Sequence, residues 1–287
     1  MTTDKDGKFE IKGAGVERLV ALRVAGAGVA ETELWVANRK GLDPKPYNEA
    51  RAEPIRPGEP IRPRFVLHAP DVSVIAEPEK LIRGTVKDID TGKPRVDVKV
   101  IPVPDGRDMF PLRLVATTDA DGKYEIHGAR KNASYTVAVD GDPDTRHIAA
   151  RVRVDDTAGY EPLTADIKVK KGVVITGKVI DTETKKPVRG YATVSVTNDN
   201  KFVKDYPGFV PTERLTVSTG ADGTFRIVTI PGPVLLVGGA SGDRDKYKRA
   251  AADPMLPGSA PGNFSKVLEI KADAETVTQD ILLEPEK

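Results

Sequence analysis

The chain has 287 residues, 44 basic and 43 acidic side chains, a net charge of +1 and no cysteine. This balance excludes the clustered basic surface that is typical of nucleic-acid binding, and the lack of cysteine excludes disulfides, thiol catalysis and Cys-ligated zinc. The length suits two or three domains of roughly 100 residues, and no apolar run approaches the roughly 18 residues that predict a membrane helix.

A short element is written three times along the chain, at Asp4–Ile11, Asp119–Ile126 and Ala221–Ile227. In each copy an Asp-Gly pair is followed by one residue, then an aromatic side chain, and then alternating apolar positions. Asp-Gly predicts a type I′ hairpin turn with positive φ at both central residues. The shared aromatic position predicts core side chains at Phe9, Tyr124 and Phe225.

The first part of the chain predicts strands at 19–24 and 71–75 from their apolar alternation. Trp35 lies in a further strand-like run at 33–36. The segment 43–63 contains six prolines and predicts an extended, polyproline-like excursion.

Two longer segments match each other, 81–94 and 174–187. Each alternates apolar and polar residues and then enters a polar turn that ends in proline, which cannot donate to a following β-ladder. Period-two patterns predict the strands that follow in each copy. These lie at 96–100, 114–117, 124–126, 135–139 and 166–169, and at 192–196, 215–218, 225–228, 234–237 and 280–283.

This pattern predicts an all-β protein of tandem antiparallel β-sandwiches, immunoglobulin-like in architecture. The expected units are 1–79, a partial or atypical sandwich with the proline-rich excursion, then 80–170, and 171–287 with long loops. The join across 169–174 is short, which predicts a stiff, beaded rod. The first unit begins in mid-repeat, so we expect a fragment of a longer protein or a sheet that is completed from outside. An exposed edge there would invite strand addition or dimerisation.

The paired segments 84–94 with 118–126, and 177–187 with 222–227, resemble the carboxypeptidase regulatory-like family. The resemblance implies transthyretin-like, seven-stranded sandwiches found in tandem in bacterial multidomain proteins. It also implies an extracellular, cell-surface or periplasmic location, although the first residues lack the apolar core of a signal peptide.

Catalytic and metal chemistry find no support in the sequence. The three histidines, His68, His127 and His147, form no zinc-peptidase pattern and are predicted to lie on the surface or at a rim. The acidic segments that begin at Asp4 and Asp119 resemble the first residues of a calcium-binding loop, but the later ligands of such a loop are missing. The prediction for these aspartates is that they form turns. We therefore predict no catalytic residue, no metal and no cofactor.

Binding and cross-linking positions can still be named. Exposed aromatic side chains serve carbohydrate binding, and the candidates are Tyr206 and Phe209 in a long loop of the third unit, with Trp35 in the first. The alternatives to binding are that Tyr206 and Phe209 anchor their loop to its own sandwich, and that Trp35 packs in the core or at a sheet edge. An internal isopeptide bond of the adhesin type would use Lys87, Asp166 and Asp140.

The favoured function is a non-catalytic structural or interaction module, a spacer or presenting array within a larger cell-surface protein. Its partners would be other domains of that parent protein, with no nucleic acid and no membrane insertion. The alternative is a carbohydrate- or peptide-binding module that uses loops of the third unit or the open edge of the first.

Overall fold

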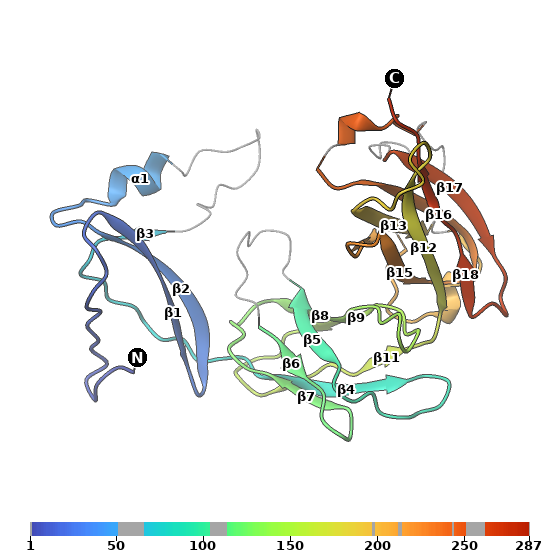
Figure 1. The fold of residues 1–287 in the computed structure, drawn as a ribbon. Helices are drawn as coiled ribbons and strands as arrows, with labels where there is room; N and C mark the ends of the chain where they lie inside the picture. The colour runs from blue at the N-terminus through green and yellow to red at the C-terminus, as the bar shows by residue number, and fades with distance from the viewer. Residues whose placement is uncertain are drawn as a thin grey trace.

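The structure is a computed structural model, and it describes residues 2–50, 66–103, 114–196, 199–211, 214–242, 244–250 and 262–286. It confirms the all-β fold and the tandem sandwiches. Three bodies follow one another from the blue N-terminal end to the red C-terminal end of the ribbon (Figure 1). They lie along a bent path (Figure 1).

The first body is a single three-stranded sheet in the order β1-β2-β3. Its strands are β1 (Arg18–Gly26), β2 (Val29–Asn38) and β3 (Leu67–His68). β1 pairs antiparallel with β2, and β3 pairs parallel with β2. The short helix α1 (Lys45–Ala50) occupies part of the proline-rich segment, which corrects the polyproline prediction there; residues 51–65 lie outside the described residues.

Two further predictions for this first body are wrong. Residues 71–75 form no strand, and residues 8–11, after the first Asp-Gly turn, form none either. Phe9 is therefore 37% exposed, whereas its counterparts Tyr124 and Phe225 are buried. The aromatic position enters a core only where a strand beyond the turn pairs with an opening strand, and the first copy lacks that partner among the described residues.

The middle sandwich has two four-stranded sheets. One has the order β10-β4-β11 with β7 also beside β4, and the other has the order β6-β5-β8-β9. The strands are β4 (Ile82–Asp88), β5 (Lys99–Val103), β6 (Ala116–Thr117), β7 (Lys123–Ile126), β8 (Ser134–Val139), β9 (Ala150–Asp155), β10 (Leu163–Thr164) and β11 (Ile167–Val169).

The C-terminal sandwich repeats this plan, with β15-β12-β18 and β19 in one sheet and β14-β13-β16-β17 in the other. Its strands are β12 (Val173–Asp181), β13 (Gly190–Val196), β14 (Leu215–Ser218), β15 (Thr224–Thr229), β16 (Gly232–Ala240), β17 (Phe264–Ile270), β18 (Thr276–Thr278) and β19 (Ile281–Leu283). Short 3-10 helices lie in its loops at Val203–Asp205 and Arg244–Lys246.

Each sandwich encloses one apolar core between its two sheets. Alternation builds these cores, because every second residue of a strand faces inward. In β7, for example, Tyr124 and Ile126 are buried while their neighbours are exposed. The closing strands β11 and β19 run parallel to β4 and β12, so the first sheet of each sandwich is mixed rather than purely antiparallel.

The repeated glycine of the opening strand has a steric reason. A Cβ at Gly84 would collide with the carbonyl oxygen of Ala165, and one at Gly177 with that of Gln279. Each carbonyl belongs to the irregular step that splits the closing strand in two. The glycine therefore allows the closing strand to approach the opening strand.

The Asp-Gly turns differ from the predicted type I′ geometry. Positive φ occurs at Gly7, Gly122 and Gly223 but at none of the aspartates before them. Gly122 N donates to Asp119 O and Asp119 N donates to Lys123 O, both at 2.9 Å, which is the three-residue hairpin with a glycine bulge. The Asp119 carboxylate also accepts the amides of Asp121 and Lys123, so the turn itself uses this acid.

Candidate functional site, the joint between the two sandwiches

The loop 140–149, which links β8 to β9, joins the middle sandwich to the C-terminal one. Its residue Ile148 is 2% exposed and belongs to the apolar core of the C-terminal sandwich, although the strand that follows belongs to the middle one. Ile148 N donates to Lys170 O at 3.0 Å, and Gly172 N donates to Arg146 O at 2.7 Å. The loop is therefore built into the connection between the sandwiches.

His147 fixes this loop to the middle sandwich. The ring is 4% exposed, its Nε2 lies 2.7 Å from Asp88 Oδ2, and its Nδ1 lies 2.9 Å from Thr145 Oγ1. The predicted surface position of His147 is wrong because the loop folds back over the end of β4, where Asp88 stands. His127 is largely exposed, as predicted, with its Nδ1 3.0 Å from Glu79, and His68 is half-buried in β3.

Asp88 is the acceptor at the centre of this contact. Its Oδ1 accepts the amides of Asp90 at 3.0 Å and Thr91 at 2.8 Å, which shapes the turn after β4. Burial opposes ionisation, yet the hydrogen bonds from His147 and Thr91 outweigh it and lower the pKa of Asp88 to about 2. Asp88 is thus a carboxylate at neutral pH.

The protonation of His147 decides one further hydrogen bond. Nε2 faces a carboxylate and so carries a proton. Nδ1 faces the Thr145 hydroxyl. That hydroxyl donates its single proton to Asp142 and accepts a hydrogen bond from Arg95 Nη2 at 2.8 Å. Burial lowers the pKa of His147, and the bond to Asp88 partly offsets that effect. In the neutral ring, Nδ1 and Asp142 compete for one hydroxyl proton; protonation of Nδ1 removes the competition.

The C-terminal sandwich contains a corresponding contact, in which a different ring reaches the aspartate. Asp181, the repeat counterpart of Asp88, accepts the amides of Glu183 and Thr184 and receives the Tyr247 hydroxyl at 3.1 Å. Tyr247 lies between β16 and β17, as His147 lies between β8 and β9. We use the word latch for each of these two contacts, Asp88 with His147 and Asp181 with Tyr247.

Among the residues that the structure describes, two ion pairs cross the joint at its surface. Arg226 of β15 contacts Asp144 and donates to Pro143 O at 3.0 Å, and Arg146 lies 2.8 Å from Glu275. Exposed pairs of this kind contribute little, typically below about 1 kcal/mol. The buried Ile148 and the backbone hydrogen bonds therefore carry most of the stabilisation.

The loop 199–211 of the C-terminal sandwich reaches back across the same joint. Tyr206 is 8% exposed and donates its hydroxyl to Lys171 O at 3.2 Å, and burial raises the pKa of Tyr206 to about 12. Gly208 O accepts Arg151 N, in the edge strand β9, at 2.8 Å. Phe209 packs against the C-terminal core. Tyr206 is thus not an exposed aromatic platform; it anchors a loop, and the loop spans two sandwiches rather than one.

The other named positions lie apart from this joint. Trp35 is half-buried in β2, opposite Ala21 and Leu67. Lys87, Asp140 and Asp166 are all exposed, and Asp166 Oδ1 accepts Thr85 N at 2.8 Å. An isopeptide bond of the adhesin type forms in a buried site, so the structure adds no support to that prediction.

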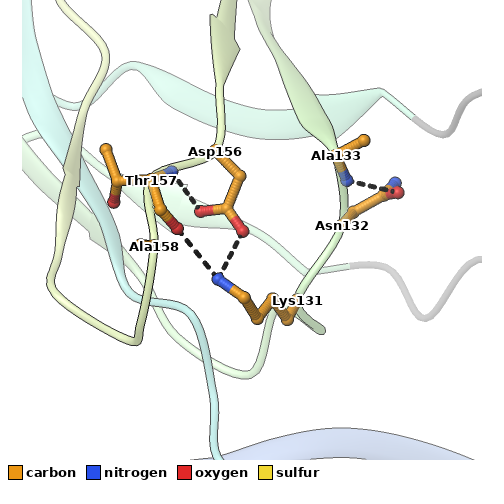
Figure 2. Close-up of a pocket in the computed structure, with 6 residues that line it drawn as sticks. All are labelled: Lys131, Asn132, Ala133, Asp156, Thr157 and Ala158. Atoms are coloured by element: carbon orange, nitrogen blue, oxygen red, sulfur yellow. Dashed lines mark hydrogen bonds and ion pairs between the residues drawn. The ribbon is translucent and has the colours of Figure 1, made fainter.

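A second buried charge, that of Lys80 just before the first strand of the middle sandwich, was not predicted from the sequence. The side chain of Lys80 is 0% exposed and its Nζ lies 2.9 Å from Asp156 Oδ1. Lys131 lies 2.7 Å from the other oxygen of Asp156 and donates to the carbonyl of Thr157 (Figure 2). It also donates to the carbonyl of Gly159. Burial opposes it, but both lysines lower the pKa of Asp156 to about 2. Lys131 and Asp156 also line a shallow surface pocket with residues 132–133 and 157–158 (Figure 2). Because both charged groups are paired within the chain, their contacts stabilise the fold and leave the pocket without a free charged group for a ligand.

No family model matches the chain, and no curated protein matches it. The resemblance to the carboxypeptidase regulatory-like family is therefore not confirmed.

Several solved pilin structures are similar in part. The shaft pilin SpaA from Lactobacillus rhamnosus GG is 14% identical over 73% of this chain and 98% of its own, with a TM-score of 0.28. A streptococcal ancillary pilin is 13% identical over 76% and 66%, with a TM-score of 0.26. BcpA, the major pilin subunit of Bacillus cereus, is 8% identical over 73% and 100%, with a TM-score of 0.26. At these values the similarity carries no argument about function.

None of the helices in the described parts of the chain has the length and apolar character to cross a membrane.

Proposed function

We propose that this chain is a non-catalytic structural module, a spacer that holds neighbouring domains of a longer, cell-surface protein at a fixed angle. Its units would be residues 1–79, 80–170 and 171–287. The observation that carries the proposal is Ile148, a residue of the middle sandwich that completes the core of the next one. A flexible tether would not share a core.

Two loops cross the joint in opposite directions, which supports the same reading. Loop 140–149 goes forward from the middle sandwich, and loop 199–211 comes back to its edge strand through Gly208 and Tyr206. Bending at the joint would have to break both sets of contacts together. Rotation of one sandwich against the other is therefore opposed by buried apolar surface as well as by hydrogen bonds.

Glycan binding by the loop 199–211 loses its main argument, because Tyr206 is buried and Phe209 packs inward. The structural role is thus the better supported of the two.

Small-angle X-ray scattering on the whole chain tests the proposal. We expect one profile that a single bent arrangement of the two sandwiches fits. A profile that only a broad ensemble of angles fits would overturn the fixed-spacer function.

A further inference from the structure

The strand β1 occupies a position that is central in both sandwiches but is an edge in the first sheet. β1, β8 and β16 each follow the Asp-Gly element of their own repeat. β8 pairs with β5 on one side and β9 on the other, and β16 pairs with β13 and β17. Within the part of the chain that the structure describes, β1 pairs with β2 alone.

Burial shows what this difference means. In β8, five of the six residues are buried, and in β16 seven of the nine. None of the nine residues of β1 is buried, although Val20, Leu22 and Val24 alternate along it as core residues do. Leu19, on the other face, is 50% exposed. The apolar side chains of β1 are thus only half-buried, whereas β8 and β16 lie between two strands and under a second sheet.

The edge has little of the usual protection against pairing. Natural edge strands are kept short or carry charges, prolines or bulges. β1 is nine residues long and contains no proline; its charges are Arg18 and Arg23, and an irregularity in its pairing with β2 lies at the hairpin end, between Val24 and Gly26. From Arg18 to Val24 the pairing with β2 is regular. A long, regular edge of this kind presents a row of backbone donors and acceptors to another strand.

We propose that the free edge of β1 binds an extended strand from a partner polypeptide, antiparallel to β1 and with apolar residues at alternate positions. The two sandwiches define that chemistry, because each fills the equivalent place with such a strand. In β13, Ala192, Val194 and Val196 face the core, and in β5 Val100 does so. The bound strand would make backbone hydrogen bonds to β1 and cover Val20, Leu22 and Val24.

Hydrogen exchange on the whole chain, read by NMR, tests this with two peptides that copy residues 189–196 and 95–103. In a strand pair only every second residue directs its N–H toward a given neighbour. We expect at least one peptide to slow the exchange of alternate amides of β1, those that do not face β2. Protection of no β1 amide by either peptide would overturn the proposal.

Two N-methylated forms of the binding peptide are the matched controls. Methylation of one alternate set of amides should abolish the protection, and methylation of the other set should leave it unchanged. Equal effects of both sets would rule out strand pairing. Sedimentation velocity gives a second check: a dimer in which the β1 amides are already protected would show that a second copy fills the edge, and would overturn the assignment to a partner strand.

Discussion

The middle and C-terminal sandwiches use the same latch with different chemistry. Asp88 and Asp181 stand at the same place in the repeat, and both shape the turn that follows the opening strand. The ring that reaches each one is His147 in the middle sandwich and Tyr247 in the C-terminal one. An ionisable ring in one and a neutral hydroxyl in the other should give one fold two different responses to mutation and pH.

The largest difference should come from removal of the aspartate. At neutral pH, Asp88→Ala leaves the Nε2–H of the buried, neutral His147 ring without an acceptor, and Asp181→Ala leaves the Tyr247 hydroxyl without one; each unpaired donor costs about 1–3 kcal/mol. The two variants should separate below pH 6.5, because without Asp88 no carboxylate stabilises a protonated His147, so the loss in Asp88→Ala should grow while that in Asp181→Ala does not. Urea unfolding followed by peptide-resolved hydrogen exchange at about pH 7 and about pH 5.5 would measure both. Losses that keep the same ratio at both pH values would contradict the comparison.

The joint can be tested by truncating a side chain that belongs to a loop of the middle sandwich but packs in the core of the C-terminal one. Ile148→Ala should cost about 3 kcal/mol, a usual value for a buried isoleucine. Because Ile148 packs in the C-terminal core, that sandwich should lose protection although the mutation lies in a loop of the middle one. Ile82→Ala, in the middle core, is the control and should destabilise the middle sandwich. Loss of protection confined to the middle sandwich in both variants would disprove the shared core.

The pH response should separate the two latches. Burial lowers the pKa of His147 below its ordinary value of 6.5, so the unfolded chain binds more protons just below that pH. His147 should therefore lower the stability of the middle sandwich as the pH drops through 6.5. The hydrogen bond to Glu79 raises the pKa of His127, which acts weakly in the opposite direction because that ring is largely exposed. Asp88, with a folded pKa of about 2 against 3.8, contributes stability above pH 3.8 that is lost only in stronger acid.

The C-terminal sandwich is the internal control for this experiment. Hydrogen bonds from Thr184 and Tyr247 lower the pKa of Asp181, so its contribution also persists until the pH falls below 3.8. We therefore expect no step near pH 6.5 there. His147→Gln, which keeps a donor for Asp88 but cannot titrate, should remove the step from the middle sandwich; a step that survives must belong to another group.

The smallest effect should come from Tyr247→Phe. It removes one hydrogen bond to Asp181, while the amides of Glu183 and Thr184 still satisfy the carboxylate. We expect a loss of about 1 kcal/mol from the free energy of unfolding. Thermal unfolding would measure it, and a loss as large as that of Asp181→Ala would mean that the hydroxyl carries the whole latch.

Period-two patterns predicted most of the paired strands, because alternation directly reflects which side chains face a core. β9 and β17 were not predicted, although Ala150, Val152 and Val154 of β9 face the core and alternate with charged residues. The short strands β3, β10 and β18 were not predicted either, because two or three residues show no periodicity. The failure at residues 71–75 has the opposite cause: the alternation is present, but no described strand pairs with it.

The candidate site was harder to predict than the fold. A histidine in a polar loop reads as exposed, and its burial depends on Asp88, which lies 59 residues earlier. One signal was present in the sequence. The aspartate recurs at the same position of both opening segments, as Asp88 and Asp181, and a residue with an imidazole or phenol ring follows β8 and β16, as His147 and Tyr247. Tyr206 was misread for a similar reason, because its partner Lys171 belongs to the connection between the sandwiches.

The central claim, a fixed joint, is tested most directly by a distance distribution across it. The chain has no cysteine, so spin labels can be placed at Lys87→Cys and Glu269→Cys alone, both of which are exposed. Double electron–electron resonance should give one narrow distribution that Ile148→Ala broadens. A broad distribution in the otherwise unaltered chain would contradict the account.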